Sequence, residues 1–182
     1  MDIDWNTVLA DQLARHWQHQ LRPRLDGLTD AEYFWEPVAG ACWNVRRRGD
    51  PAGPGSGDYT IDFTFPQPVP PPVTTIAWRL AHVIVGCLGM RNAAHFGGPP
   101  VDYQTHEYAG TAAQALGQLD DGYAAWMNGV RALGPDGLRR PCGPAEPYPE
   151  ASMAELVLHI HREVIHHGAE ISLLRDLYRN RS

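Results

Sequence analysis

The chain has 182 residues, of which 43 % are hydrophobic and 20 % charged, and its formal net charge is −6. This composition is typical of a globular protein that buries a sizeable core, and we expect a single domain over residues 1–182. The acidic charge balance argues against a nucleic-acid partner, and no run of about 18 apolar residues is present to span a membrane.

The first element in chain order is a helix predicted over residues 4–25. Its apolar residues recur at helical spacing; they are Trp5, Val8, Leu9, Leu13, Trp17 and Leu21. Residues 26–72 follow and are rich in Gly and Pro, including GDPAGPGSGD, which predicts a long irregular excursion. Within it YTIDFTF alternates polar and apolar residues as a short strand does, but the sequence does not reveal its partner strand.

Three more helices are expected after the excursion. The second begins at a threonine cap, Thr74 or Thr75, ends near FGGPP and is apolar almost all the way round. The third begins with a capping-box pattern at Thr111 and reaches about residue 134, and the fourth begins with the same pattern at Ser152 and reaches about Tyr178. The sequence therefore predicts an all-α fold, a four-helix bundle with a long excursion between helices 1 and 2.

The cysteines and the N-terminus indicate a compartment. Cys42, Cys87 and Cys142 are widely spaced and form no C-x-x-C pair, which is typical of free thiols rather than of a disulfide frame or a zinc knuckle. The start MDIDWNTVLADQLARHW is acidic and amphipathic, unlike a signal peptide. We therefore expect a cytoplasmic protein.

The fourth predicted helix carries many polar groups, in LVLHIHREVIHHGAEISLL. At about 100° per residue its apolar residues form one stripe, with His167 inside the stripe and Glu163 at its edge. Because these two residues are four positions apart, their side chains can converge on one point. Three further polar residues fall on the flank beside Glu163: His159, His166 and Glu170. His161 falls on roughly the opposite side and is expected to be solvated.

A Glu–His pair on an apolar helix has two explanations. It can be a core ion pair, or the histidine can simply bind a neighbouring helix, although burying an isolated pair is rarely stabilising. Alternatively, a divalent metal compensates the carboxylate and takes a neutral imidazole as a ligand. A metal site needs a third protein ligand from elsewhere in the chain.

His82, in AWRLAHVIVGCLGM, is the candidate third ligand. With Arg79 it is the only polar residue in the apolar part of the second helix. It can also be a core histidine satisfied by a carbonyl group. Gly86 and Gly89 lie on its side of the helix and would leave a hollow for water or substrate, unless they only allow close packing. Cys87 would point about 140° away from His82 and is expected to pack rather than to bind metal.

His82, Glu163 and His167 together make a His₂Glu ligand set. Such a set leaves coordination positions open, as in catalytic zinc sites, and it also suits iron(II) or nickel. The pattern EVIH at residues 163–166 has the spacing of di-iron bundles, but no second Glu-x-x-His occurs. A His-Glu-x-x-His motif is also absent.

These residues resemble the DinB-like superfamily, and within it the metal-binding domain of mycothiol-dependent maleylpyruvate isomerase. The resemblance rests on WRLAH ending in His82, on HREVIHHGAEI around Glu163 and His167, and on EYFWEPVAGACWNV after the first helix. Many superfamily members use three histidines, whereas Glu163 matches the His, Glu, His set of the isomerase group. The resemblance implies a DinB-like four-helix bundle, one divalent metal that is often zinc or nickel, frequent homodimers, and chemistry with a low-molecular-weight thiol such as mycothiol.

We therefore expect a metal-dependent thiol transferase or isomerase-like enzyme that presents a metal-bound thiolate to an electrophilic small molecule. The candidate proton carriers are His166 and His159. The candidates for binding substrate or thiol are Arg79, Arg46 and Arg47 within the basic run at residues 46–48, and Trp43 as a pocket wall. The arginines of the run can equally belong to a solvated loop, and Trp43 to the core.

Two other functions stay open. One is metal-assisted hydrolysis, in which metal-bound water is the nucleophile. The other is a non-catalytic metal-binding or stress-response bundle whose metal stabilises the fold.

Overall fold

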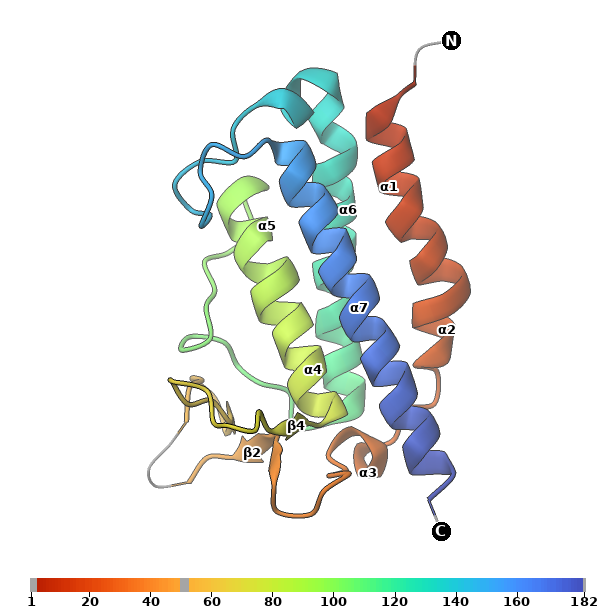
Figure 1. The fold of residues 1–182 in the computed structure, drawn as a ribbon, viewed down its shortest axis with the longest axis vertical. Helices are drawn as coiled ribbons and strands as arrows, with labels where there is room; N and C mark the ends of the chain where they lie inside the picture. Colours follow the sequence, from red (N-terminus) through yellow and green to blue (C-terminus); the bar gives the residue numbers. More distant parts are fainter. Residues whose placement is uncertain (1–2, 50–52, 182) are drawn as a thin grey trace.

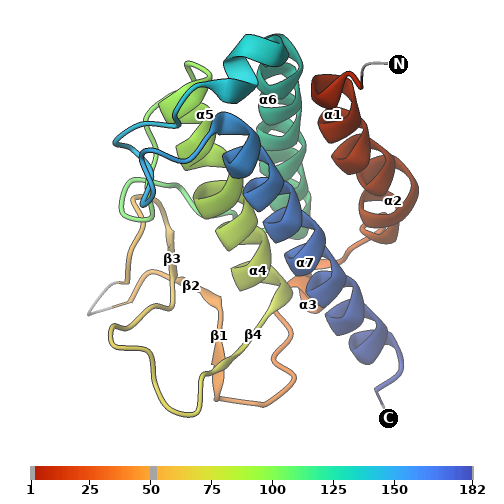
Figure 2. The ribbon, with the colours of Figure 1, turned by 45° about the horizontal axis from the view of Figure 1, so that its top comes forward.

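The computed structural model describes residues 3–49 and 53–181, and the chain is mostly helical (Figure 1). Long helical stretches run side by side, and the irregular segment lies across the end of the molecule where α4 begins (Figure 2). The predicted all-α class is supported. The part of the expected excursion at residues 50–52 lies outside the described residues.

The first helical stretch matches the predicted helix. It consists of α1 (Trp5–His16), the π-helical turn η1 (Trp17–Leu21) and α2 (Arg22–Arg24). The Asp4 carboxylate caps α1 by accepting a hydrogen bond from the backbone N–H of Thr7. Of the predicted apolar face, four residues are buried, whereas Trp5 and Val8 are exposed; the buried four are Leu9, Leu13, Trp17 and Leu21.

The second stretch contains α4 (Ile76–His82), the π-helical turn η2 (Val83–Gly89) and α5 (Met90–His95). Thr75 is its cap, because its hydroxyl accepts a hydrogen bond from the backbone N–H of Trp78. At the end of η2, the N–H of Met90 bonds to the carbonyl of Val85, five residues back. This wider winding changes which side chains share a face of the helix.

The two remaining long helices are α6 (Ala112–Arg139) and α7 (Met153–Arg179). A non-helical residue, Gly134 with φ 63°, interrupts α6 just before Pro135, close to the predicted end of the third helix. At the start of α7 a capping box links Ser152 and Glu155, as predicted. Helix α7 packs against α1, α4, η2 and α6, so most of its faces are covered.

The excursion holds short elements. They are α3 (Asp30–Tyr33), β1 (Cys42–Trp43), β2 (Val45–Arg47), β3 (Tyr59–Ile61) and β4 (Val73–Thr74). Strand β3 covers the first part of the predicted strand, and its partner is β2, antiparallel, with Arg46 opposite Thr60. Strands β1 and β4 pair in parallel and lead into α4.

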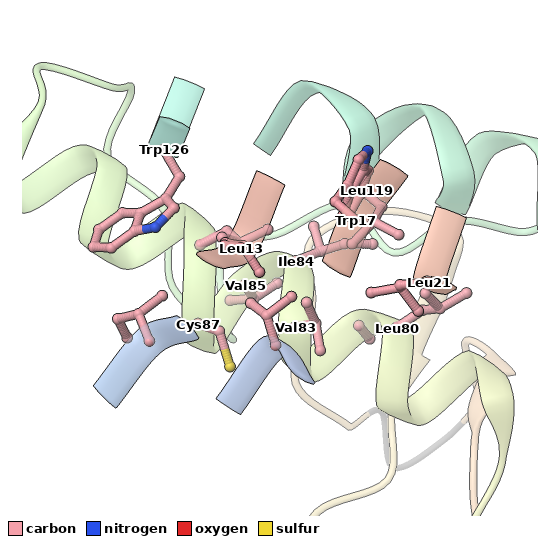
Figure 3. Close-up of a cluster of buried hydrophobic side chains, with 14 of the residues drawn as sticks. Leu13, Trp17, Leu21, Leu80, Val83, Ile84, Val85, Cys87, Leu119 and Trp126 are labelled. Carbon is pink, nitrogen blue, oxygen red and sulfur yellow. The ribbon is translucent and has the colours of Figure 1, made fainter. Parts of the chain in front are cut away.

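Hydrophobic side chains join the long helices (Figure 3). Leu13 and Trp17 come from the first stretch, Leu80 and Cys87 from the second, and Trp126 from α6. All are buried, so the second stretch lies in the interior, as its apolar sequence predicts.

A buried ion pair fixes the C-terminal part of α7 to α3. Glu32 is 3 % exposed and Arg175 is 1 % exposed, and the Arg175 Nε donates to Glu32 Oε1 at 3.0 Å. Arg175 also donates to the carbonyl of Arg24, and the backbone N–H of Thr29 donates to Glu32 Oε2 at 2.9 Å. Burial acts to raise the pKa of Glu32, but the hydrogen bonds from Arg175 and Thr29 outweigh it and hold this pKa below its usual value.

Replacement of Glu32 by glutamine should destabilise the protein strongly, because Arg175 would keep its buried charge without a carboxylate. The expected loss is about 3–5 kcal/mol of unfolding free energy, measured by urea denaturation. The matched control is Asp176→Asn, which removes an exposed pair with Arg24 and should cost no more than about 1 kcal/mol. Equal effects of the two substitutions would contradict the assignment of Glu32 and Arg175 as the critical pair.

His161 corrects a prediction, because it is 0 % exposed rather than solvated. Its ring lies 6.2 Å from the Trp126 ring of α6, between centroids. Neighbouring helices also cover the side of α7 opposite the predicted stripe. The apolar pattern of α7 alone does not reveal this second covered side. Neither ring nitrogen has a hydrogen-bond partner among the described residues, and burial lowers the pKa of His161 to about 4.

The protein should therefore lose stability in mild acid. Between pH 6.5 and about 4 the unfolded chain binds a proton at His161 that the native chain does not, so stability is complete above this window and falls as the pH decreases through it. The loss of unfolding free energy due to His161 should reach about 3 kcal/mol near pH 4. In the metal-free protein, His161→Phe should reduce the difference in unfolding free energy between pH 7 and pH 4.5, whereas His19→Phe on the exposed face should not. An unchanged difference in His161→Phe would show that this histidine does not cause the acid sensitivity.

Candidate metal centre

The three predicted metal ligands come together. Ligand atoms of His82, Glu163 and His167 all lie within 4.8 Å of one another. His82 is the last residue of α4, and the other two are one turn apart on α7. The two imidazole rings are 4.7 Å apart between centroids and nearly perpendicular, at 87°. Glu163 Oε2 lies 3.5 Å from His167 Nε2.

Each imidazole is held through its Nδ1 atom. His82 Nδ1 lies 2.7 Å from the Tyr103 hydroxyl, and His167 Nδ1 lies 2.7 Å from Glu170 Oε2. With the proton on Nδ1, each ring donates to its oxygen partner and turns the lone pair of Nε2 toward the cluster. This arrangement is typical of metal-binding histidines, whose other nitrogen is fixed by a carboxylate or hydroxyl.

Burial and nearby charge keep the imidazole of His82 neutral. Burial lowers the pKa of His82 to about 4, and the positive charge of Arg79 adds to this effect. Arg79 Nε lies 3.0 Å from Glu170 Oε2, so the guanidinium stabilises the carboxylate that fixes His167. His82 is therefore uncharged at neutral pH, which is the form that binds metal.

The donor set and its spacing fit a divalent ion. In a tetrahedral zinc site, metal–ligand bonds of about 2.0–2.2 Å place neighbouring nitrogen and oxygen donors about 3.4 Å apart. The distance of 3.5 Å between His167 Nε2 and Glu163 Oε2 agrees with this value. The Glu163 side chain is 27 % exposed, so an ion can reach the cluster from solvent.

A second group of potential ligands shares His167 and adds His166 and Glu170. His166 is exposed, with Nε2 3.5 Å from Glu170 Oε1. All three residues lie on α7, and His167 Nδ1 already contacts Glu170. The His82 cluster joins two helices and leaves both Nε2 atoms available, so we consider it the better metal site.

The predicted proton carriers lie near this cluster, two turns apart on α7. His159 Nδ1 lies 3.7 Å from Glu163 Oε1, and Arg162 Nε lies 3.6 Å from the same oxygen. His166 contacts Glu170 rather than Glu163. His159 and His166 are both exposed and can exchange protons with solvent.

The predicted substrate-binding residues of the excursion are engaged elsewhere. Arg46 forms ion pairs with Glu36 and Asp62 at 2.8 and 2.7 Å, and Arg47 lies over the ring of Tyr59. The ring of Trp43 lies 5.6 Å from that of Trp78, which in turn lies 5.7 Å from His82. Trp43 is therefore one ring removed from the cluster, and among the described contacts neither arginine reaches it.

The expected hollow beside His82 is filled. A Cβ atom on Gly86 would collide with the Tyr103 hydroxyl, and one on Gly89 would lie 3.0 Å from a methyl carbon of Val101. The two glycines therefore make room for side chains from the loop after α5. The two glycines in the apolar helix indicated that space is needed beside His82. The residue that fills this space, Tyr103, lies in a loop without a periodic pattern, so the sequence did not predict it.

The orientation expected for Cys87 was wrong. Its Sγ lies 3.7 Å from His82 Nε2 rather than on the far side of the helix. The expected angle assumed 3.6 residues per turn, whereas these residues flank and enter the π-helical turn η2. In a π-helix the residue five positions on comes close to the starting residue, because hydrogen bonds join positions i and i+5.

Comparison with known proteins identifies the family. A model of the DinB superfamily matches residues 12–171. The chain belongs to the DinB superfamily. The match includes all three candidate ligands of this DinB-superfamily protein. No curated protein and no solved structure matches the chain. No helix within residues 3–49 and 53–181 is long and apolar enough to cross a membrane.

Removal of Glu163 from this DinB-superfamily protein should abolish metal binding. In protein purified without a histidine tag, elemental analysis should give close to one divalent metal per chain. The content should fall by more than about 10-fold in Glu163→Ala, because loss of the only carboxylate leaves two neutral ligands. Asp176→Ala, which removes another carboxylate from α7, should keep the metal. Unchanged metal in Glu163→Ala would exclude Glu163 as a ligand.

Proposed function

We propose that this protein is a divalent-metal-dependent thiol transferase or isomerase-like enzyme of the cytoplasm, most closely related to the metal-binding domain of mycothiol-dependent maleylpyruvate isomerase. It would act as a DinB-like four-helix bundle, in a homodimer, on a small-molecule thiol and an electrophilic substrate. The observation that carries the proposal is the meeting of ligand atoms from two imidazoles and one carboxylate within 4.8 Å. Both imidazoles are also fixed through Nδ1.

The chemistry follows from this ligand set. Zinc or nickel, or iron(II), suits two histidines and a carboxylate, and such an ion holds a coordinating thiol as the thiolate at neutral pH. Arg79 and Glu170 keep His167 in place, and Tyr103 keeps His82 in place. His159, exposed beside Glu163, is positioned to exchange a proton between solvent and the reacting molecules.

A neighbouring cavity supports a site for the electrophile. It has a volume of about 480 Å³ and is walled by apolar side chains including Leu156 and Tyr148. His159, Arg162 and Arg91 also line it. The first two contact Glu163, and Arg91 donates to the carbonyl of Gly86. Glu146 and Glu155 line it as well, and Arg91 is paired with Glu146 at 3.0 Å. The cavity therefore lies next to the metal ligands and has apolar walls with a few polar groups, which suits a small apolar electrophile.

Turnover should require both metal and thiol. The zinc-loaded protein, given monochlorobimane and mycothiol, should form the fluorescent thioether at least about 100-fold faster than the same protein with His82→Ala, since the activated thiolate would be lost. Chelation should have the same effect, and Asp176→Ala should retain activity.

Other outcomes separate the alternative functions. Turnover of an electrophilic ester without any thiol would indicate hydrolysis by metal-bound water. If wide screens of thiols and electrophiles gave no turnover while chelation sharply lowered the melting temperature, the metal would be structural and the proposal would be wrong.

A further inference from the structure

The segment between α6 and α7 covers one side of the cavity next to Glu163. It lies beside α5 in both views of the ribbon (Figures 1 and 2). Half of the residues that line the cavity belong to this segment, and most of the others belong to α7. Among the lining residues, Cys142 and Leu156 are buried, whereas His159 and Arg162 are exposed. The segment therefore forms a roof over the part of α7 that leads to the candidate metal centre.

The two ends of this roof are fixed to each other. The backbone N–H of Cys142 donates to the carbonyl of Ala151 at 2.8 Å, and that of Gly143 donates to the carbonyl of Pro149 at 2.9 Å. Gly143 has a φ of 85°, a left-handed conformation that glycine adopts without strain. The loop at residues 143–150 contains three prolines, each of which fixes a backbone φ angle. A movement of the loop would therefore turn it about its ends as one stiff flap.

One carboxylate attaches the loop to α5. Glu146 Oε2 lies 3.0 Å from Arg91 Nη2, and Glu146 Oε1 lies 3.0 Å from His95 Nε2. The side chains of Glu146 and His95 are each 5 % exposed, so these contacts are shielded from water. The structure describes all of residues 143–150, and within them no other side chain forms a hydrogen bond or ion pair outside the loop. Glu146 is thus the one polar side-chain attachment of the loop.

The pair of Arg91 and Glu146 also separates two cavities. The cavity next to Glu163 has a volume of about 480 Å³, and a second cavity, lined in part by Met90 and Val101, has a volume of about 460 Å³. Arg91 and Glu146 line both. Arg91 also donates to a backbone carbonyl of η2, so it would stay with the helix if the loop moved. Separation of Glu146 from Arg91 would therefore lift the roof and join the two cavities.

We propose that residues 143–150 form a lid latched by Glu146, and that release of the latch admits small apolar molecules to the cavity. This inference rests on the proposed function, because the cavity is the proposed site of the electrophile. The closed lid limits the size of the bound molecule and keeps water from it. A carboxylate suits a reversible latch, because hydration on opening offsets much of the ion pairing that is lost. The lid can therefore open while the helices stay folded.

Hydrogen exchange of the metal-free protein tests the latch. Glu146→Gln keeps the size of the side chain but removes the charge that binds Arg91 and His95. The hydrogen-bonded amides of Gly143 and Ala151 should then exchange at least about 10-fold faster than in the wild type, because the lid opens more often. The matched control is Glu150→Gln, which removes an exposed carboxylate from the same loop and should leave these exchange rates unchanged.

Binding of a neutral apolar dye tests access to the cavity. The probe is N-phenyl-1-naphthylamine, whose fluorescence increases in apolar surroundings, and its association rate is measured by stopped flow on the metal-free protein. The rate should be at least about 5-fold higher for Glu146→Gln than for the wild type, because the lid limits entry. Glu150→Gln should bind the dye at the wild-type rate.

Three results would overturn the lid. The first is equal exchange and equal dye association in Glu146→Gln and the wild type. The second is a rise in exchange of the same size at the amides of α7, which would show that Glu146 stabilises the whole fold. The third is measured on the wild type alone and holds even if the variant does not fold: exchange at Gly143 and Ala151 as slow as in the buried part of α7.

These measurements need neither metal nor thiol, so they distinguish the lid from the proposed function. A lid that responds as expected in a protein without any thiol turnover would support the lid and overturn the thiol transferase. Thiol turnover together with an unresponsive lid would overturn the lid alone.

Discussion

The orientation of two imidazole rings is the constraint on which the candidate site depends. His82 and His167 lie on different helices, and each ring is fixed by an oxygen atom at Nδ1, from Tyr103 and Glu170 respectively. With Nδ1 engaged in this way, the Nε2 atom of each ring is left available as a metal ligand. Arg79 extends the network, because it neutralises Glu170 from the same helix that carries His82. The geometry of the three ligands therefore depends on the hydrogen bonds and ion pair that surround them.

The fold supplies these supports from separate parts of the chain. Helix α7 provides two ligands and one support, and it packs against α1, α4, η2 and α6. Its C-terminal part is tied to α3 by Glu32 and Arg175, both of which are buried. The excursion lies at the end of the molecule where α4 begins and keeps Arg46 in its own ion pairs. The excursion thus forms its own ion pairs, whereas the helices α4 and α7 carry the candidate metal ligands.

The sequence predicted those features that depend on local periodicity. The long helices followed from apolar spacing and caps such as Ser152, and the pairing of Glu163 with His167 followed from their spacing of four residues. The sequence-based prediction failed where packing against other parts of the chain decides the burial or orientation of a side chain. His161 is buried because α7 is covered on several sides, Tyr103 comes from an aperiodic loop, and Cys87 is turned by a π-helical segment that no pattern indicated. The partner of strand β3 was also unknown until β2 was placed beside it.

The close approach of Tyr103 to Gly86 has a consequence for how this protein can vary. Because even a methyl group at position 86 would displace the tyrosine ring, the two positions form a coupled pair in which a gain of volume at one requires a loss at the other. An alanine at 86 combined with a smaller residue at 103 would restore packing but remove the hydroxyl from His82. Substitutions at positions 86 and 103 are therefore limited by the hydrogen bond to His82 as well as by side-chain volume.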